Sequence, residues 1–149
     1  MKKTIVFGLT MILIFSFCNA YSFAFSEEVV DIHYYSDGSY GVTLLKTSNS
    51  KGIKTGTKGY KHYDSNDNLV WEASITASFT YNGTTANCSE ASIAYHIYKN
   101  SWSLTSSNRS RSGATATGNF TFKNYVLGVP IQTINKTLTL TCSPNGTIT

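Results

Sequence analysis

Residues 71–81 carry the pattern that most constrains the fold of this 149-residue chain. Apolar and polar side chains alternate strictly there, which is the period of a strand with one buried and one solvated face. One face has Trp71, Ala73, Ile75, Ala77, Phe79 and Tyr81, and the other has Glu72, Ser74, Thr76, Ser78 and Thr80. Asn82-Gly83 follows at once and is a strong hairpin signal. The segment predicts one strand of an antiparallel sheet that borders a core.

Several other segments alternate in the same way. Residues 91–98 predict a strand with four inward side chains, those of Ala91, Ile93, Tyr95 and Ile97. Residues 29–35, 40–46 and 114–122 predict further strands, and a last strand has Ile134, Leu138, Leu140 and Cys142 on one face. Pro130 near its start predicts an edge position or a bulge. Turns are expected at 36–39, 64–68 and 127–128, a polar loop at 106–113, and a mobile loop or edge strand at 48–59.

This spacing of strands and turns predicts an all-β fold. Seven or eight short strands with a turn signal every ten residues or so are typical of a β-sandwich or small barrel. We therefore expect one antiparallel β-sandwich, immunoglobulin-like or barrel-like, in a single domain over residues 25–149.

The first 24 residues predict export. Lys2 and Lys3 precede a short apolar run at residues 5–17, and small residues at Ala20 and Ala24 offer cleavage points, as in a secretory signal peptide. Release after Ala24 is favoured, and release after Ala20 is the alternative. We expect a secreted, extracellular protein, with association with the cell surface as a further option, and no stable membrane anchor after cleavage.

Export also bears on the cysteines. Removal of Cys18 with the signal leaves Cys88 and Cys142, and an even count in an exported chain predicts one disulfide. The chain-entropy model gives such a bond a stabilisation of about 4 kcal/mol. Two free buried thiols are the alternative.

The charge of the chain argues against nucleic acid as a partner. The formal net charge is +4, and Lys2 and Lys3 account for two of these charges. A nucleic-acid-binding domain usually has a much stronger basic footprint.

Candidate catalytic groups are sparse. His33, His62 and His96 have no metal-ligand spacing, and no recognised nucleophile or metal motif is present. The segment 64–68 resembles the start of a calcium loop, but Leu69 and Ile75 stand where that loop needs glycine and an acid. A turn is the better interpretation, because Asp and Asn favour turns. We expect no enzyme activity, no metal and no cofactor.

Two sets of residues are candidates for binding. The first is a cationic, aromatic strip that includes Lys51 and His62 and whose central residues are Lys54, Lys58, Tyr60, Lys61 and Tyr63. It suits a cell-wall polymer or a lipid surface, but lysines also protect edge strands from self-pairing. The second is a set of aromatic residues that could stack on sugars if exposed: Tyr34, Tyr40, Tyr98, Trp102 and Tyr125. Arg109 and Arg111 share a face if their segment is extended.

Two stretches together resemble a known group of proteins. Residues 71–89, WEASITASFTYNGTTANCS, and residues 128–146, GVPIQTINKTLTLTCSPNG, are similar to a family of small secreted proteins of Gram-positive bacteria with no assigned function. The resemblance implies an exported β domain with a Cys88–Cys142 disulfide and transfers no catalytic residue.

The sequence thus favours a non-catalytic extracellular or cell-envelope binding module, with a cell-wall polymer or glycan as its partner. A secreted antimicrobial or toxin-like protein is the alternative.

Overall fold

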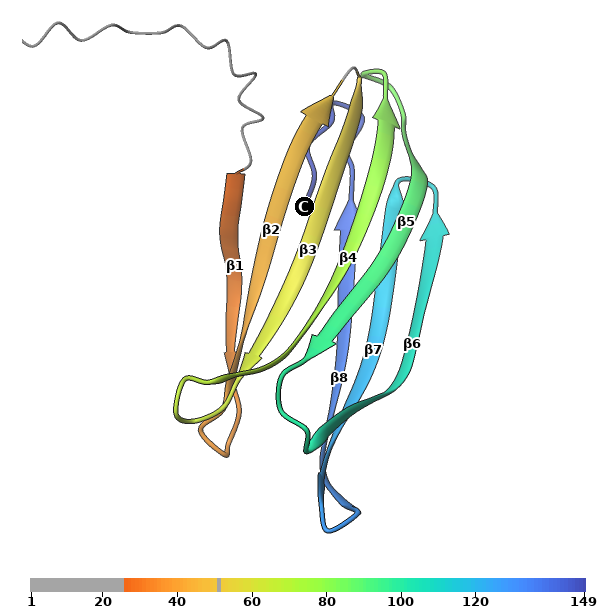
Figure 1. Cartoon of the computed structure of the whole chain (residues 1–149). Helices are drawn as coiled ribbons and strands as arrows, with labels where there is room; N and C mark the ends of the chain where they lie inside the picture. The colour runs from red at the N-terminus through yellow and green to blue at the C-terminus, as the bar shows by residue number, and fades with distance from the viewer. Residues whose placement is uncertain (1–25, 51) are drawn as a thin grey trace, which may run out of the picture.

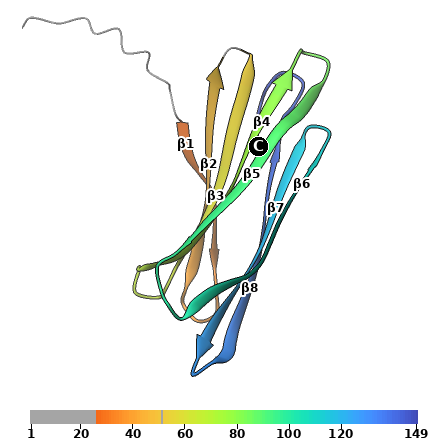
Figure 2. The same ribbon diagram turned by 45° about the vertical axis from the view of Figure 1, so that its right-hand side comes forward.

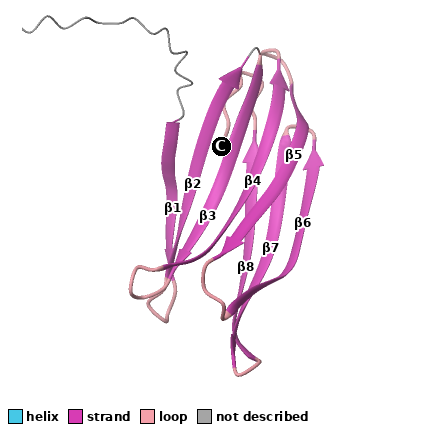
Figure 3. Ribbon diagram, in the orientation of Figure 1, coloured by secondary structure: helices cyan, strands magenta, loops and turns pink. Residues whose placement is uncertain are grey.

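The computed structural model describes residues 26–50 and 52–149, and in these residues the fold is all-β (Figure 3). No helix long and apolar enough to cross a membrane occurs in that part of the chain. The predicted signal peptide lies outside the described residues. The eight strands are β1 (Ser26–Tyr34), β2 (Tyr40–Ser50), β3 (Ile53–Tyr63), β4 (Leu69–Tyr81), β5 (Ala86–Ile97), β6 (Trp102–Ser112), β7 (Thr115–Val126) and β8 (Val129–Thr141).

The strands form two antiparallel sheets in a β-sandwich-like arrangement (Figure 1). The five-stranded sheet has the order β1-β2-β3-β4-β5, and the three-stranded sheet has the order β6-β7-β8. Every neighbour in a sheet is also the neighbour along the chain, so hairpins make all the connections within a sheet. An immunoglobulin domain has Greek-key connections instead, so the immunoglobulin-like version of the prediction is wrong.

The core lies between the two sheets (Figure 2), where β3, β4 and β5 contact β7 and β8. The predicted inward face of β4 is confirmed, because Trp71, Ala73, Ile75, Ala77 and Phe79 are all buried. The Trp71 ring stacks on Phe122 of the opposite sheet, with ring centroids 3.9 Å apart. Alternation along β4 therefore places its aromatic side chains where the second sheet can cover them.

The inward face predicted for the last strand is also confirmed. Ile134, Leu138, Leu140 and Cys142 are buried. β8 is an edge strand, and its register with β7 shifts where Pro130 pairs with Tyr125. Both expectations for Pro130, an edge position and a bulge, are thus met.

Two glycines in the five-stranded sheet leave room for buried side chains. A Cβ at Gly41 would lie 1.7 Å from the Tyr60 hydroxyl, so the Tyr60 ring needs the bare backbone of β2 at this point. A Cβ at Gly56 would lie 2.9 Å from Ile148, a residue of the C-terminal segment. These glycines permit close packing.

Two predicted loops are strands in the structure. Residues 106–113 were expected to form a polar loop, but most of them belong to β6, which pairs with β7 along its length. Residues 48–59 were expected to be a mobile loop or an edge strand, but they form the end of β2 and much of β3, both inside the sheet. Backbone pairing with a neighbouring strand explains both cases, because it does not need an apolar face.

The two cysteines lie on either side of one turn. The amide of Cys88 donates to the carbonyl of Gly113, and the amide of Cys142 donates to the carbonyl of Ala114. Both thiols are buried, and the structure contains them as free cysteines. The predicted disulfide is thus absent from the structure and stays a prediction.

Candidate functional site

The five-stranded sheet has one face against the core and one face toward solvent, which we call the outer face. The registers align its side chains in rows across the strands. One such row runs Val29, Leu44, Gly59, Ser74 and Ala94 from β1 to β5. The middle of this row has unusually small side chains, and a row of larger residues flanks it on each side.

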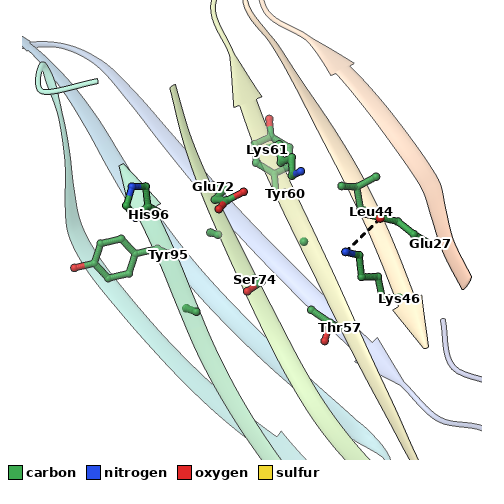
Figure 4. Close-up of a pocket in the computed structure, with 13 residues that line it drawn as sticks. Glu27, Leu44, Lys46, Thr57, Tyr60, Lys61, Glu72, Ser74, Tyr95 and His96 are labelled. Carbon is green, nitrogen blue, oxygen red and sulfur yellow. Dashed lines mark ion pairs between the residues drawn. The ribbon is translucent and has the colours of Figure 1, made fainter. Parts of the chain in front are cut away.

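A cavity of about 310 Å³ opens along this row of small residues (Figure 4), and we call it the outer trough. Leu44, Gly59, Ser74 and Ala94 form its floor, and the neighbouring rows form its walls. The wall residues on β1 to β3 are Glu27, Lys46, Thr57 and Lys61, and those on β4 and β5 are Glu72 and His96. Tyr60, Ala73 and Tyr95 complete the lining.

The charges of the outer trough balance. Glu27 and Lys46 form an ion pair at 3.2 Å on the β1–β2 side. Lys61 and Glu72 are direct cross-strand neighbours on the β3–β4 side. The Glu72 carboxylate accepts a hydrogen bond of 2.9 Å from the Tyr98 hydroxyl, and this bond raises the pKa of Tyr98. Two carboxylates and two ammonium groups thus line one polar depression.

A row of tyrosines crosses the same face at one end of the sheet. Tyr34, Tyr40 and Tyr63 are paired in register on β1, β2 and β3. The Tyr40 and Tyr63 rings are stacked at 5.0 Å, and the Tyr34 ring lies 5.8 Å from Tyr40. Tyr34 is 72% exposed. The Tyr34 ring is tilted by 37° to the Tyr40 ring, and the tyrosine row is open to solvent at its β1 end.

Tyr98, just after β5, extends the aromatic surface beside the outer trough. Its side chain is 50% exposed, and its ring lies 4.4 Å from the ring of His96. Two of the aromatic residues proposed for sugar stacking, Tyr34 and Tyr98, are therefore well exposed. Trp102 is buried in the core, and Tyr40 and Tyr125 are half-buried.

The predicted cationic strip does not form one surface. β3 alternates, so Lys54, Lys58 and Tyr60 point to the core side and Lys61 and Tyr63 to the outer face. Only Lys61 and Tyr63 therefore lie on the same side as the outer trough. Lys51 lies outside the described residues.

Tyr60 occupies the inner side of the sheet and is 0% exposed. Its hydroxyl is 2.8 Å from that of Tyr35, and the Lys136 ammonium lies 4.0 Å from its ring centroid. Burial raises the pKa of Tyr60 far above its usual value and lowers that of Lys136. A fully covered side chain of this kind stabilises the fold and is not a binding surface.

The segment 64–68 is a turn, as predicted. One carboxylate oxygen of Asp64 accepts the backbone N–H groups of Asn66 and Asn68, each at 3.0 Å. These bonds lower the pKa of Asp64. Within residues 26–50 and 52–149 no group of three or more His, Cys, Asp and Glu side chains is arranged to hold a metal ion.

Arg109 and Arg111 lie on the exposed edge strand β6, so their segment is extended. Both residues point to the same face, because they are two positions apart. The Arg111 guanidinium donates to the carbonyl of Ser89 on β5. Arg111 thus connects the two sheets at this edge.

No family model matches the chain, and neither the curated proteins nor the solved structures gave a significant match. The resemblance to a family of secreted Gram-positive proteins therefore stays a prediction.

Proposed function

We propose that this protein is a non-catalytic extracellular binding module and that the outer trough binds a neutral glycan. The observation that carries the proposal is the row of small residues across an uncovered sheet face, with polar walls and a tyrosine row at one end. Binding sites are typically concave, with an apolar part and a few polar groups that fix orientation. The outer trough has both.

The chemistry of a sugar ring suits these walls. A pyranose has hydroxyl groups that donate and accept hydrogen bonds and a face of C–H groups that packs on apolar or aromatic surfaces. Lys61, Glu72 and His96 can bond the hydroxyls, and Leu44 can contact the C–H face. The trough crosses the sheet, where four strand spacings of about 4.8 Å each give a length of about 19 Å. This length suits a short linear oligosaccharide.

Charge balance favours a neutral ligand over an anionic polymer. The outer trough has equal numbers of carboxylate and ammonium groups. A polyanion such as teichoic acid would meet Glu27 and Glu72 as well as the two lysines. The cationic strip, which was the sequence-based reason to expect a polyanion, is divided between two faces of β3.

A substitution on the floor tests the proposal. Gly59→Val adds a side chain where a Cβ would meet only the Ala73 carbonyl oxygen, at 4.0 Å, so the strand tolerates it while the trough fills. Ser92→Val is the matched control, since Ser92 is on the same face but outside the lining. We expect the wild type and Ser92→Val to bind a member of a panel of neutral oligosaccharides in calorimetry. Gly59→Val should bind at least tenfold more weakly at an unchanged melting temperature.

Three results would contradict the proposal. Equal affinity of Gly59→Val and the wild type would place the ligand elsewhere. Binding to teichoic acid alone would contradict a neutral ligand. Release of reducing ends that is abolished in Glu72→Gln would show that the site is catalytic.

We further propose export by the predicted signal peptide and a β-sandwich closed by a Cys88–Cys142 disulfide. Supporting the bond, both cysteines are buried and hydrogen-bond to the consecutive residues Gly113 and Ala114 of one turn. Formation would remove two protons and two electrons from the thiols, with an external disulfide or oxygen as acceptor. N-terminal sequencing of the released protein should begin at Phe25.

A further inference from the structure

The β7–β8 hairpin ends in an exposed apolar tip, residues 126–131, which we call the hairpin tip. Leu127 is 100% exposed, and Val126, Val129 and Ile131 are each at least half exposed. Figures 1 and 2 both show this hairpin extending past the other turns at its end of the molecule. In soluble proteins single exposed apolar residues are common, but a contiguous group on a projection indicates an interaction site.

The turn itself has an unfavourable residue for folding. Leu127 and Gly128 have φ values of 50° and 80°, so both central residues of this two-residue turn are in the left-handed region. Asn-Gly is the preferred sequence for such a turn, because asparagine tolerates positive φ and leucine does not. A fully exposed leucine in this turn is therefore explained by neither the turn nor the core.

Polar and charged residues flank the hairpin tip. Gln132, directly after it, donates a hydrogen bond of 3.0 Å to the carboxylate of Asp37, which lies in the turn between β1 and β2. Lys123 is three residues before the hairpin tip, and the half-buried Tyr125 directly precedes it. An apolar end flanked by a tyrosine and charged residues is the arrangement found where proteins meet the interface of a bilayer.

We propose that the hairpin tip inserts reversibly into the interfacial region of a lipid bilayer. The three outermost residues on each strand reach about 10 Å at about 3.3 Å per residue, which matches the depth of interfacial insertion. Val126 and Val129 pair with each other next to the turn, so the two strands are paired up to the turn itself. An apolar environment requires this, because it offers no water to backbone polar groups. A partner protein would need a groove that fits the projecting hairpin tip. A bilayer needs no such groove, because it adapts to a convex shape.

This inference is independent of the proposed glycan site. The hairpin tip belongs to the three-stranded sheet at one end of the molecule, whereas the outer trough crosses the middle of the other sheet. End-on contact with a membrane would leave the outer trough open to solvent. Each proposal can therefore fail while the other holds.

Vesicle sedimentation with Leu127→Asn tests the proposal. This substitution gives the turn its preferred Asn-Gly sequence, so folding should be retained or improved while the apolar tip is lost. We expect the wild-type protein to bind vesicles of equal phosphatidylglycerol and phosphatidylcholine, with little change as salt rises. Leu127→Asn should bind at least tenfold more weakly. Ile53→Asn, which removes an exposed apolar residue from the opposite end of the molecule, should bind as the wild type does.

A second variant separates apolarity from shape. Val126→Thr with Val129→Thr keeps β-branched side chains that suit strands but makes the hairpin tip polar. It should lose binding in the same way as Leu127→Asn. The proposal is overturned if the wild type ignores these vesicles or if Leu127→Asn binds them equally well. A wild-type dimer in sedimentation velocity that dissociates in Leu127→Asn would also overturn it, because the hairpin tip would then cover a second copy.

Discussion

Trp71 connects the two sheets more directly than any other side chain described above. It is 0% exposed and stacks on Phe122, and its ring also lies 5.1 Å from the ring of His62 and 6.0 Å from that of Trp102. Its position follows from the alternation along residues 71–81.

We predict that Trp71→Ala lowers the free energy of unfolding by about 3–5 kcal/mol, as loss of a large buried aromatic residue does. Urea denaturation followed by circular dichroism would measure the change. A cost below about 1 kcal/mol would mean that the side chain is not in a packed core.

His62 is buried among aromatic rings, and its Nδ1 has no hydrogen-bond partner in the described part of the chain. Burial lowers its pKa from 6.5 to about 4, although Asp37 and Asp64 oppose the shift. The unfolded chain therefore binds more protons than the folded one between these two pH values. The contribution of His62 to the free energy of unfolding is therefore fully present above pH 6.5 and is lost as the pH falls toward 4.

The size of this pH effect is testable with His62→Phe, which keeps an aromatic ring and removes the titrating group. Between pH 7 and pH 4 the wild type should lose about 3 kcal/mol more unfolding free energy than the variant does. Denaturant titrations of both proteins at the two pH values would measure the difference. Equal losses would show that His62 titrates normally in the folded state.

The face of a strand to which a side chain points could be predicted only where apolar and polar residues alternate around it. Trp71 has apolar residues at every second position, which identify its face. The strip near Tyr60 mixes glycine, threonine and lysine, so its pattern does not show which side is buried. Gly41 permits the burial of Tyr60, and that contact joins residues of two strands whose register the sequence does not reveal.

Strands with one buried face were predictable, and strands without one were not. β4 and β8 alternate between apolar and polar, and their buried faces are confirmed. β6 is an edge strand and most of its side chains are exposed on both faces, so its polar sequence resembles a loop. Its hydrogen bonds to β7 stabilise it without any periodic signal.

The outer trough is lined by all five strands of its sheet and could be predicted only in part. Alternation already placed Glu72, Ser74, Ala94 and His96 on outward faces. The alignment of Leu44, Gly59, Ser74 and Ala94 into one row depends on strand pairing, which is set by turns and bulges. A glycine within a strand was the available signal, since it often marks a close approach of a ligand or backbone.

The predicted disulfide connects β5 with the segment after β8. We expect Cys88→Ser to lower the melting temperature of the oxidised protein well beyond the effect of a surface substitution, with a loss of up to about 4 kcal/mol. Differential scanning calorimetry with and without a reductant would measure it. An unchanged midpoint under oxidising conditions would refute the bond, and full reaction of both cysteines with a thiol reagent after unfolding would do the same.

The two sheets of the whole molecule differ in charge. All eight acidic residues precede residue 91, whereas the three-stranded sheet has only cationic charged residues. The outer trough has two charges of each sign. We propose two surfaces of different chemistry on this domain, a glycan site on one sheet and a membrane contact at the end of the other.

We propose the outer face of the five-stranded sheet as the ligand surface. Titration of ¹⁵N-labelled protein with the neutral oligosaccharide that binds best would locate the site by amide chemical-shift changes. We predict the largest changes at Leu44, Gly59, Ser74 and Ala94. Changes confined to the three-stranded sheet, or none at saturating oligosaccharide, would show that this face does not bind the oligosaccharide.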